Sequence, residues 1–298
     1  MPRFVVRFVA CAHLLSAWLW LPASAAAQSD HDLIALTTAN RLVRLSTVDT
    51  CATGAPVKVT GLQPSETLLG IDFRPATGEL YGLGSTSRLY RIDAFTGQAT
   101  AVGGAPLAIA LSGTSFGFDF NPTVDLIRIV SNTGQNLRAH PDLGTIVDFD
   151  AVTPGVQPDG SLAYDATTAD GDPADVNAGA LPLAVAAAYT NPDNDPATGT
   201  ALYVIDADLN ALTLQAPPNN GVLNTVGVLG ANTTQLAGFD IATTNQAYAA
   251  LKLVGGDTVK GCGNSGLVQI DLATGATTVV GVIGTPNPIV GLAVDLQN

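Results

Sequence analysis

Carboxylates occur in two patterns along this 298-residue chain, and both patterns suit a hard cation such as calcium. The first pattern is a run of acids in a glycine- and proline-rich stretch, Asp170-Gly-Asp172-Pro-Ala-Asp175-Val-Asn177. Calcium prefers carboxylate and amide oxygens, and glycine permits the tight turn that aims several of them at one ion. The run lacks the bidentate glutamate of the helix–loop–helix calcium motif, so a solvated acidic loop is the alternative interpretation.

The second pattern is an aspartate that recurs at one position of a repeated motif, as Asp72, Asp119 and Asp240. If the repeats form a ring, these side chains face its central tunnel and could hold a cation together. Alternatively, each carboxylate accepts a hydrogen bond from a backbone N–H group of the neighbouring repeat and fixes how the repeats stack. Periodic occurrence favours the structural role, because a residue that binds a ligand need not repeat.

Sequence signals for catalysis are lacking. The chain contains no phosphate loop, and no motif ties a serine to a histidine. Arg74, Arg128 and Arg138 could bind an anionic group, but pairing with the surplus acids is the simpler expectation. With 25 acidic and 12 basic residues, the net charge of −13 argues against nucleic acid or anionic membranes as partners.

The N-terminal 27 residues read as a signal peptide. Arg3 and Arg7 precede the apolar run Phe8–Leu21, and Ala25-Ala-Ala27 supplies small residues for cleavage. We therefore expect an extracytoplasmic protein, periplasmic or secreted, that starts near Gln28. No cysteine lies at the cleavage point and no later stretch is apolar enough to span a bilayer, so we expect no membrane anchor.

Cys51 and Cys262 are the two cysteines outside this leader, and in an exported protein they are candidates for a disulfide. Strand alternation places their two connections on opposite rims of the predicted ring. Only a long loop, residues 255–266, could bend round to join them. The pairing stays open on the sequence alone.

Four short alternating segments repeat as a unit at intervals of about fifty residues. One unit reads Gly70-Ile-Asp-Phe-Arg-Pro75, Glu79-Leu-Tyr-Gly-Leu-Gly84, Arg88-Leu-Tyr-Arg-Ile-Asp93 and Ala99-Thr-Ala-Val102, with a hairpin turn over residues 93–97. The unit returns from Gly117, Ala187 and Gly238. Such repeats of four alternating strands are typical of β-propeller blades.

The two ends of the chain complement each other. Residues 291–298 look like a first strand with no blade after it, and residues 31–69 look like a blade with no first strand. We therefore predict an all-β, five-bladed propeller of four antiparallel strands per blade, formed by residues 28–298 as one domain. The C-terminal strand would complete the N-terminal blade. Residues 148–185 read as an Asp/Gly/Pro-rich insertion; six blades would require a further blade from that stretch.

The ordered motifs also resemble a known family. Gly70-Ile-Asp-Phe-Arg-Pro75, the following Leu-Tyr-Arg-Ile-Asp and Val185-Ala-Ala-Ala-Tyr-Thr-Asn-Pro192 are similar to bacterial exported proteins catalogued as domain of unknown function 4394. The resemblance covers residues 31–298. It implies an extracytoplasmic propeller-like domain and carries no agreed catalytic residues.

The leading hypothesis is a non-catalytic exported propeller that acts as a binding or interaction module, with calcium as a candidate stabilising ion. Its partner would be a small molecule, a glycan or a protein, and the protein would be a monomer. The alternative is a metal-dependent hydrolase or lyase that uses carboxylates at the tunnel mouth on a secreted small molecule or polysaccharide, because fold alone does not exclude an enzyme.

Overall fold

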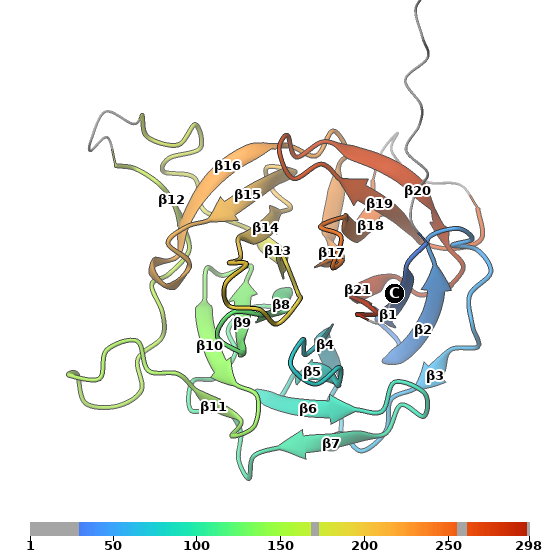
Figure 1. Ribbon diagram of the computed structural model, residues 1–298, viewed down its shortest axis with the longest axis horizontal. Coiled ribbons are helices and arrows are strands. Elements are labelled where there is room, and N and C mark those ends of the chain that lie inside the picture. Colours follow the sequence, from blue (N-terminus) through green and yellow to red (C-terminus); the bar gives the residue numbers. More distant parts are fainter. Residues whose placement is uncertain (1–29, 168–172, 255–260, 297–298) are drawn as a thin grey trace, which may run out of the picture.

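The computed structural model describes residues 30–167, 173–254 and 261–296, and these form five antiparallel sheets arranged around one axis (Figure 1). The predicted five-bladed propeller is confirmed. Between the third and fourth blades the described residues form only one short strand, β12 (Ala163–Tyr164), which joins the fourth blade. The six-blade alternative is therefore wrong. The predicted signal peptide, residues 1–27, lies outside the described residues.

Each blade is named here by its order around the ring, with its strands given from the axis outward. Blade 1 comprises β21 (Ile289–Val294), β1 (Asp32–Thr37), β2 (Arg41–Ser46) and β3 (Val57–Lys58). Blade 2 comprises β4 (Leu68–Phe73), β5 (Leu80–Gly84), β6 (Arg88–Ile92) and β7 (Ala99–Val102). Blade 3 comprises β8 (Phe116–Asn121), β9 (Leu126–Ser131), β10 (Asn136–His140) and β11 (Thr145–Ile146).

The last two blades have longer outer strands. Blade 4 comprises β13 (Ala184–Tyr189), β14 (Leu202–Asp206), β15 (Ala211–Gln215) and β16 (Val222–Val228), with β12 parallel to β16 at its edge. Blade 5 comprises β17 (Thr233–Ile241), β18 (Ala247–Leu253), β19 (Ser265–Ile270) and β20 (Thr277–Ile283). A single 3-10 turn, η2 (Pro218–Asn220), connects β15 to β16. No helix in the described part of the chain is long and apolar enough to cross a membrane.

The ring closes as predicted. The C-terminal strand β21 pairs antiparallel with β1, with Leu33 opposite Val294 and Ala35 opposite Leu292. Blade 1 is thus built from both ends of the chain. Because β21 fills the first-strand position, blade 1 has four strands, as blades 2 and 3 do.

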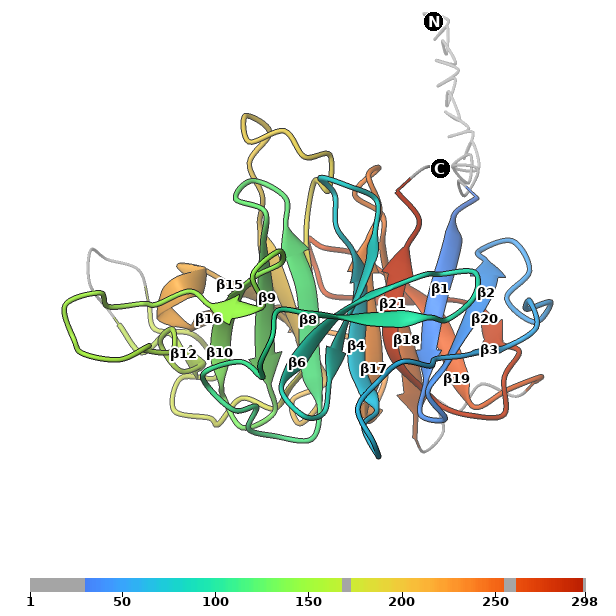
Figure 2. The ribbon, with the colours of Figure 1, turned by 90° about the horizontal axis from the view of Figure 1, so that it is seen from below.

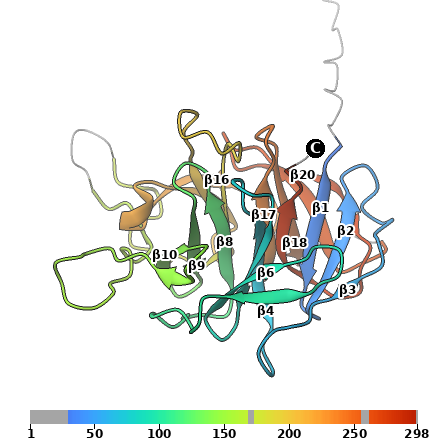
Figure 3. The same cartoon turned by 60° about the horizontal axis from the view of Figure 1, so that its bottom comes forward.

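Strand twist separates the inner strands from the outer ones. The innermost strands stand along the axis, whereas outer strands such as β6, β7 and β16 lie across it (Figures 1 and 2). Each strand is rotated relative to its neighbour, and the rotations add up from the axis to the rim. The loop between β11 and β12 projects from the rim beside blades 3 and 4 (Figure 3).

Glycines allow the inner strands to meet at the axis. Gly70, Gly117, Gly238 and Gly291 occupy one repeat position and Ala187 occupies it in blade 4. A Cβ atom added to Gly238 would lie only 2.5 Å from the backbone of Gly291 and Leu292, so a side chain there would force blades 5 and 1 apart. The space left within this ring of small residues is about 10 Å³.

Candidate functional site

The three repeated aspartates meet at the axis. Asp72, Asp119 and Asp240 each follow the small axial residue of their strand by two positions, and side chains two apart in a strand share a face. All three are buried. One carboxylate oxygen from each lies within 4.8 Å of the other two. The sequence prediction that these residues face one another is confirmed.

The same carboxylates also join neighbouring blades, so the structural alternative is confirmed as well. Each one accepts a hydrogen bond from a backbone N–H group on the first strand of the next blade. The bonds are Asp72 to the nitrogen of Phe120 at 2.8 Å, Asp119 to that of Tyr189 at 3.0 Å, and Asp240 to that of Val294 at 2.6 Å. We call this contact the axial bond.

The axial bond holds three of the five blade interfaces, namely 2/3, 3/4 and 5/1. Tyr189 and Ala293 occupy the aspartate position in blades 4 and 1. Neither side chain carries a carboxylate, so interfaces 4/5 and 1/2 have no axial bond. The axial bond therefore stabilises only some of the blade interfaces around the ring.

Burial among like charges disfavours ionisation of the triad. Burial raises the pKa of Asp240 to about 7. Burial, and secondly the charge of Asp240, hold the pKa of Asp72 well above its usual range. The pKa of Asp119 is raised by burial and then by the charges of both other aspartates. A buried group of three carboxylates needs protons or a cation to offset this repulsion.

Three carboxylate oxygens are a partial set of ligands for a metal. Calcium takes six to eight oxygens at about 2.3–2.6 Å, so the triad alone would supply less than a full shell. The aspartates are 3–5% exposed, which leaves a substrate no path to contact them directly. The triad is consequently suited to holding blades together and to binding a proton or a small cation.

The acidic run in the insertion is only partly visible. Asp170 and Asp172 lie outside the described residues. Asp175 accepts hydrogen bonds from the backbone N–H of Thr225 at 2.5 Å and from its hydroxyl at 2.8 Å. The Asn177 amide donates to the same hydroxyl at 2.8 Å. These two residues fasten the insertion to β16, and calcium at the run stays a prediction.

A buried ionic cluster lies between blades 3 and 4. The carboxylate of Asp159, in the insertion, accepts from the Arg128 guanidinium at 2.6 Å and from Arg138 at 2.8 and 2.9 Å. Arg128 also donates to the side-chain oxygens of Asn136 at 2.8 Å and Asn219 at 2.6 Å. The expectation that these arginines pair with acids is confirmed. The sequence does not indicate that Asp159 is the acid that pairs with Arg128 and Arg138, because the insertion is not part of the repeat.

Arg74 pairs in the same way across interface 2/3. Its guanidinium donates to the carboxylates of Asp125 at 2.8 Å and Asp142 at 2.7 Å, both in blade 3 loops. These contacts hold its pKa above the usual range. The three arginines considered as anion sites therefore fasten blades.

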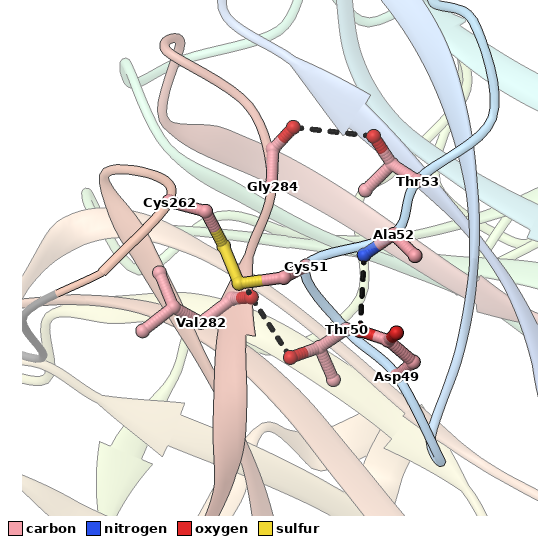
Figure 4. The surroundings of a disulfide bond; sticks show 8 residues. All are labelled: Asp49, Thr50, Cys51, Ala52, Thr53, Cys262, Val282 and Gly284. Atoms are coloured by element: carbon pink, nitrogen blue, oxygen red, sulfur yellow. Dashed lines mark hydrogen bonds between the residues drawn. A yellow bond between two sulfur atoms is a disulfide. The ribbon is translucent and has the colours of Figure 1, made fainter.

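Cys51 and Cys262 form a disulfide, with Cα atoms 5.9 Å apart (Figure 4). The expected obstacle of opposite rims does not apply, because the strongly twisted outer strand β20 ends against blade 1. There the Thr50 hydroxyl donates to the carbonyl of Val282 at 2.8 Å (Figure 4). Disulfides persist in oxidising compartments, so the bond indicates an extracytoplasmic protein.

A cleft of about 730 Å³ lies between blades 1 and 2. Phe95, in the turn between β6 and β7, is 78% exposed beside it. The guanidinium carbon of Arg44, on β2, lies 4.1 Å from the centre of the Phe95 ring. The polar residues that line the cleft are Arg44, Glu79, Arg91, Asp93, Thr96, Gln98, Thr100 and Asp295.

Sequence reasoning missed this cleft. The segment from Asp93 to Gly97 reads as a hairpin turn, and Asp93 does accept the backbone N–H groups of Phe95 and Thr96, both at 2.9 Å. The sequence did offer one signal, because Phe95 is an aromatic residue in a turn whose geometry does not require one.

Solved structures with a similar arrangement are distant. A chain in the crystal structure of a nidogen/laminin complex aligns over 91% of this chain and 100% of its own, at 15% identity and a TM-score of 0.44. A protein of unknown function from Bacteroides thetaiotaomicron VPI-5482 aligns over 88% of this chain and 61% of its own, at 13% identity and a TM-score of 0.44. An auxiliary nutrient binding protein from Bacteroides ovatus ATCC 8483 aligns over 73% of this chain and 55% of its own, at 12% identity and a TM-score of 0.40. No curated protein matches.

The repeated motifs, the closed ring and the axial aspartates together span nearly the whole chain. A family model, described as a domain of unknown function, matches residues 31–293, which lie within the range 31–298 of the sequence resemblance. The chain therefore belongs to the DUF4394 family.

Proposed function

We propose that this protein is a non-catalytic propeller, periplasmic or secreted, that binds its ligand in the cleft between blades 1 and 2. The observation that carries the proposal is the cleft itself, about 730 Å³ with the exposed Phe95 at its side. Ligand pockets are concave, of about 300–1,000 Å³, and combine apolar surface with a few placed polar groups. Phe95 contacts Arg44 of blade 1 with its ring and keeps most of its surface exposed to the cleft.

The polar groups of the cleft suit binding better than catalysis. Asp93 is occupied by the N–H groups of its own turn, and Arg91 lies 3.6 Å from Glu79 as an ion pair. Neither arrangement pairs a nucleophile with a base. The alternative enzyme would use the axial carboxylates, which are too buried to contact a substrate.

The absence of an axial bond at interface 1/2 supports the location. Around the rim this interface is held by backbone contacts, in which Thr60 donates to the carbonyl of Gly97 at 2.9 Å and accepts from Ala99 at 2.8 Å. The two blades are thus joined at the rim and by a shared apolar core, with the cleft beside these contacts. A ligand in the cleft would contact both blades, Arg44 on blade 1 and Phe95 on blade 2.

Thermal-shift measurements on the purified protein test the site. A library of small molecules, short peptides and soluble glycans is screened, since a ligand that binds only the folded state raises the Tm. We expect hits whose shift is lost in Phe95→Ala and in Arg44→Ala but kept in Phe149→Ala, an exposed aromatic residue of the insertion. Hits that all survive both cleft substitutions would place the binding site elsewhere.

A cation at the axis is a second candidate function, supported by the three oxygens within 4.8 Å of one another. Ions at this point would stabilise the ring and replace the shared protons. Unfolding at pH 8 in calcium and then in chelator measures this directly. A Tm that rises with calcium and falls with chelator, and that no longer responds in Asp119→Asn, supports the cation; an unchanged Tm removes it. The same pair of measurements on Asp175→Asn tests calcium at the insertion.

A further inference from the structure

We infer that the ligand of the cleft between blades 1 and 2 is an uncharged carbohydrate, presented as a soluble polysaccharide or its fragments. The inference rests on the proposed function and names the chemical class of its ligand.

The charges of the cleft nearly cancel. Two guanidinium groups, Arg44 and Arg91, face three carboxylates, Glu79, Asp93 and Asp295. A polyanion would approach the three acids on a protein whose net charge is already −13. A neutral ligand does not meet that repulsion.

The same groups alternate donors with acceptors. Guanidinium groups only donate hydrogen bonds and carboxylates only accept them, whereas the hydroxyls of Thr96 and Thr100 do both. A sugar carries many hydroxyls, each of which donates and accepts, so it can satisfy both kinds of group at once. An apolar ligand would cover these groups without offering them hydrogen bonds, which is costly on burial.

The Arg44–Phe95 pair supplies the apolar surface that a sugar ring needs. The guanidinium lies over one face of the Phe95 ring at 4.1 Å, and the residue is still 78% exposed. The C–H face of a pyranose is apolar and can pack against such a ring, as apolar surface is removed from water. Stacking uses the flat face of Arg44 and leaves its N–H edge directed away from the ring for hydroxyl groups.

The volume fits more than one sugar unit. A cleft of about 730 Å³ that is open to solvent can hold a short oligosaccharide while a polymer continues past it. Binding along a chain of repeating sugars also tolerates a weak affinity at each unit, because neighbouring units rebind.

Affinity electrophoresis on native gels tests the inference. Full-length protein, processed as it is by its own host, is run through gels that contain one soluble polymer each: galactomannan, xylan, β-glucan and dextran as neutral polymers, and polygalacturonate as a charged control. We expect retardation by at least one neutral polymer. Phe95→Ala should weaken it at least tenfold, and Glu79→Gln several-fold, while Phe149→Ala leaves it unchanged. Circular dichroism establishes that each variant is folded.

The outcomes separate the ligand class from the site. If no neutral polymer retards the protein, or polygalacturonate alone does, the carbohydrate is the wrong class. The site itself would then still stand if a peptide or an acid from the thermal-shift library loses its effect in Phe95→Ala. If a neutral polymer retards the protein and Phe95→Ala does not change that retardation, the cleft is not the binding site. The assignment of a carbohydrate to the cleft would then fall as well.

Discussion

Interfaces 3/4 and 1/2 of the same ring are held in opposite ways. At 3/4, Asp119 forms an axial bond to Tyr189 and the buried Asp159 pairs with Arg128 and Arg138. At 1/2, Ala293 replaces the aspartate, and the blades are joined by a shared apolar core and by backbone bonds at Thr60, beside a cleft with a stacked Arg44 and Phe95. A repeat protein can thus keep its architecture while neighbouring interfaces are held by different contacts.

The two fastenings at 3/4 also differ from each other in charge. The axial triad gathers three carboxylates, and protons or a cation must offset them. The cluster at Asp159 sets one carboxylate against two guanidinium groups. The stability that the axial triad contributes should therefore depend on pH. The stability that the Asp159 cluster contributes should instead be lost when any one of its members is replaced.

The largest effect is expected from Asp159→Ala. It leaves the Arg128 guanidinium buried without its carboxylate, which typically costs about 3–5 kcal/mol of unfolding free energy. Urea unfolding followed by circular dichroism measures the loss. Asp150→Ala, a partly exposed acid of the same insertion whose carboxylate bonds only within its own turn, should cost much less. Joint replacement, Asp159→Leu with Arg128→Met, should cost less than Asp159→Ala; an equal or larger loss would show that packing rather than charge holds the cluster.

Removal of the disulfide should come next. Cys51→Ser with Cys262→Ser frees two residues that are 211 apart in sequence, and disulfides typically contribute about 2–4 kcal/mol. This bond reinforces interface 5/1 in the way that Asp159 reinforces 3/4. Unfolding of the wild-type protein in reductant should match the double variant. If reductant leaves the wild-type midpoint in place, the bond contributes nothing to stability.

Paired substitutions at Asp119 should divide its two roles. Asp119→Ala leaves the buried N–H of Tyr189 without its acceptor, at a cost of about 1–3 kcal/mol. Asp119→Asn keeps an oxygen for that N–H and removes one charge from the triad. We expect Asp119→Asn to be more stable than Asp119→Ala at every pH, and to gain on the wild type as pH rises to 8. Equal losses for both would mean that the axial bond does not matter.

The most gradual effect is the pH dependence of the wild-type protein. The folded pKa of Asp240 is about 7, whereas an unfolded aspartate titrates near 3.9. Between these values the folded state holds more protons, so stability is present at low pH and is lost as pH rises through 7. Each excess proton changes the unfolding free energy by about 1 kcal/mol per pH unit. Urea midpoints at pH 5 and 8 test this; a higher midpoint at pH 8 without calcium would contradict it.

The repeated parts of the molecule could be predicted from the sequence. In blades 2, 3 and 5 an aspartate follows the small axial residue by two positions. This register was enough to predict from the sequence that Asp72, Asp119 and Asp240 lie together. Both of their predicted arrangements hold, because one oxygen of each carboxylate bonds the next blade while the carboxylates also approach one another.

The unrepeated parts could not be predicted. Arg44 and Phe95 belong to different blades, and their stacking depends on how the outer strands twist rather than on any motif. Asp159 reaches Arg128 from an insertion without period. The disulfide looked obstructed for the same reason, since the sequence indicates strand order but not how far the twist carries the end of β20.

Blade 1 has a consequence for biogenesis. Its strand β1 is made early, but β21, which lies between β1 and the axis, is synthesised only after four other blades. A growing chain therefore carries an unfinished sheet until β21 has been made. Cys51 likewise waits for Cys262, so the ring and its covalent link are completed at nearly the same stage of synthesis.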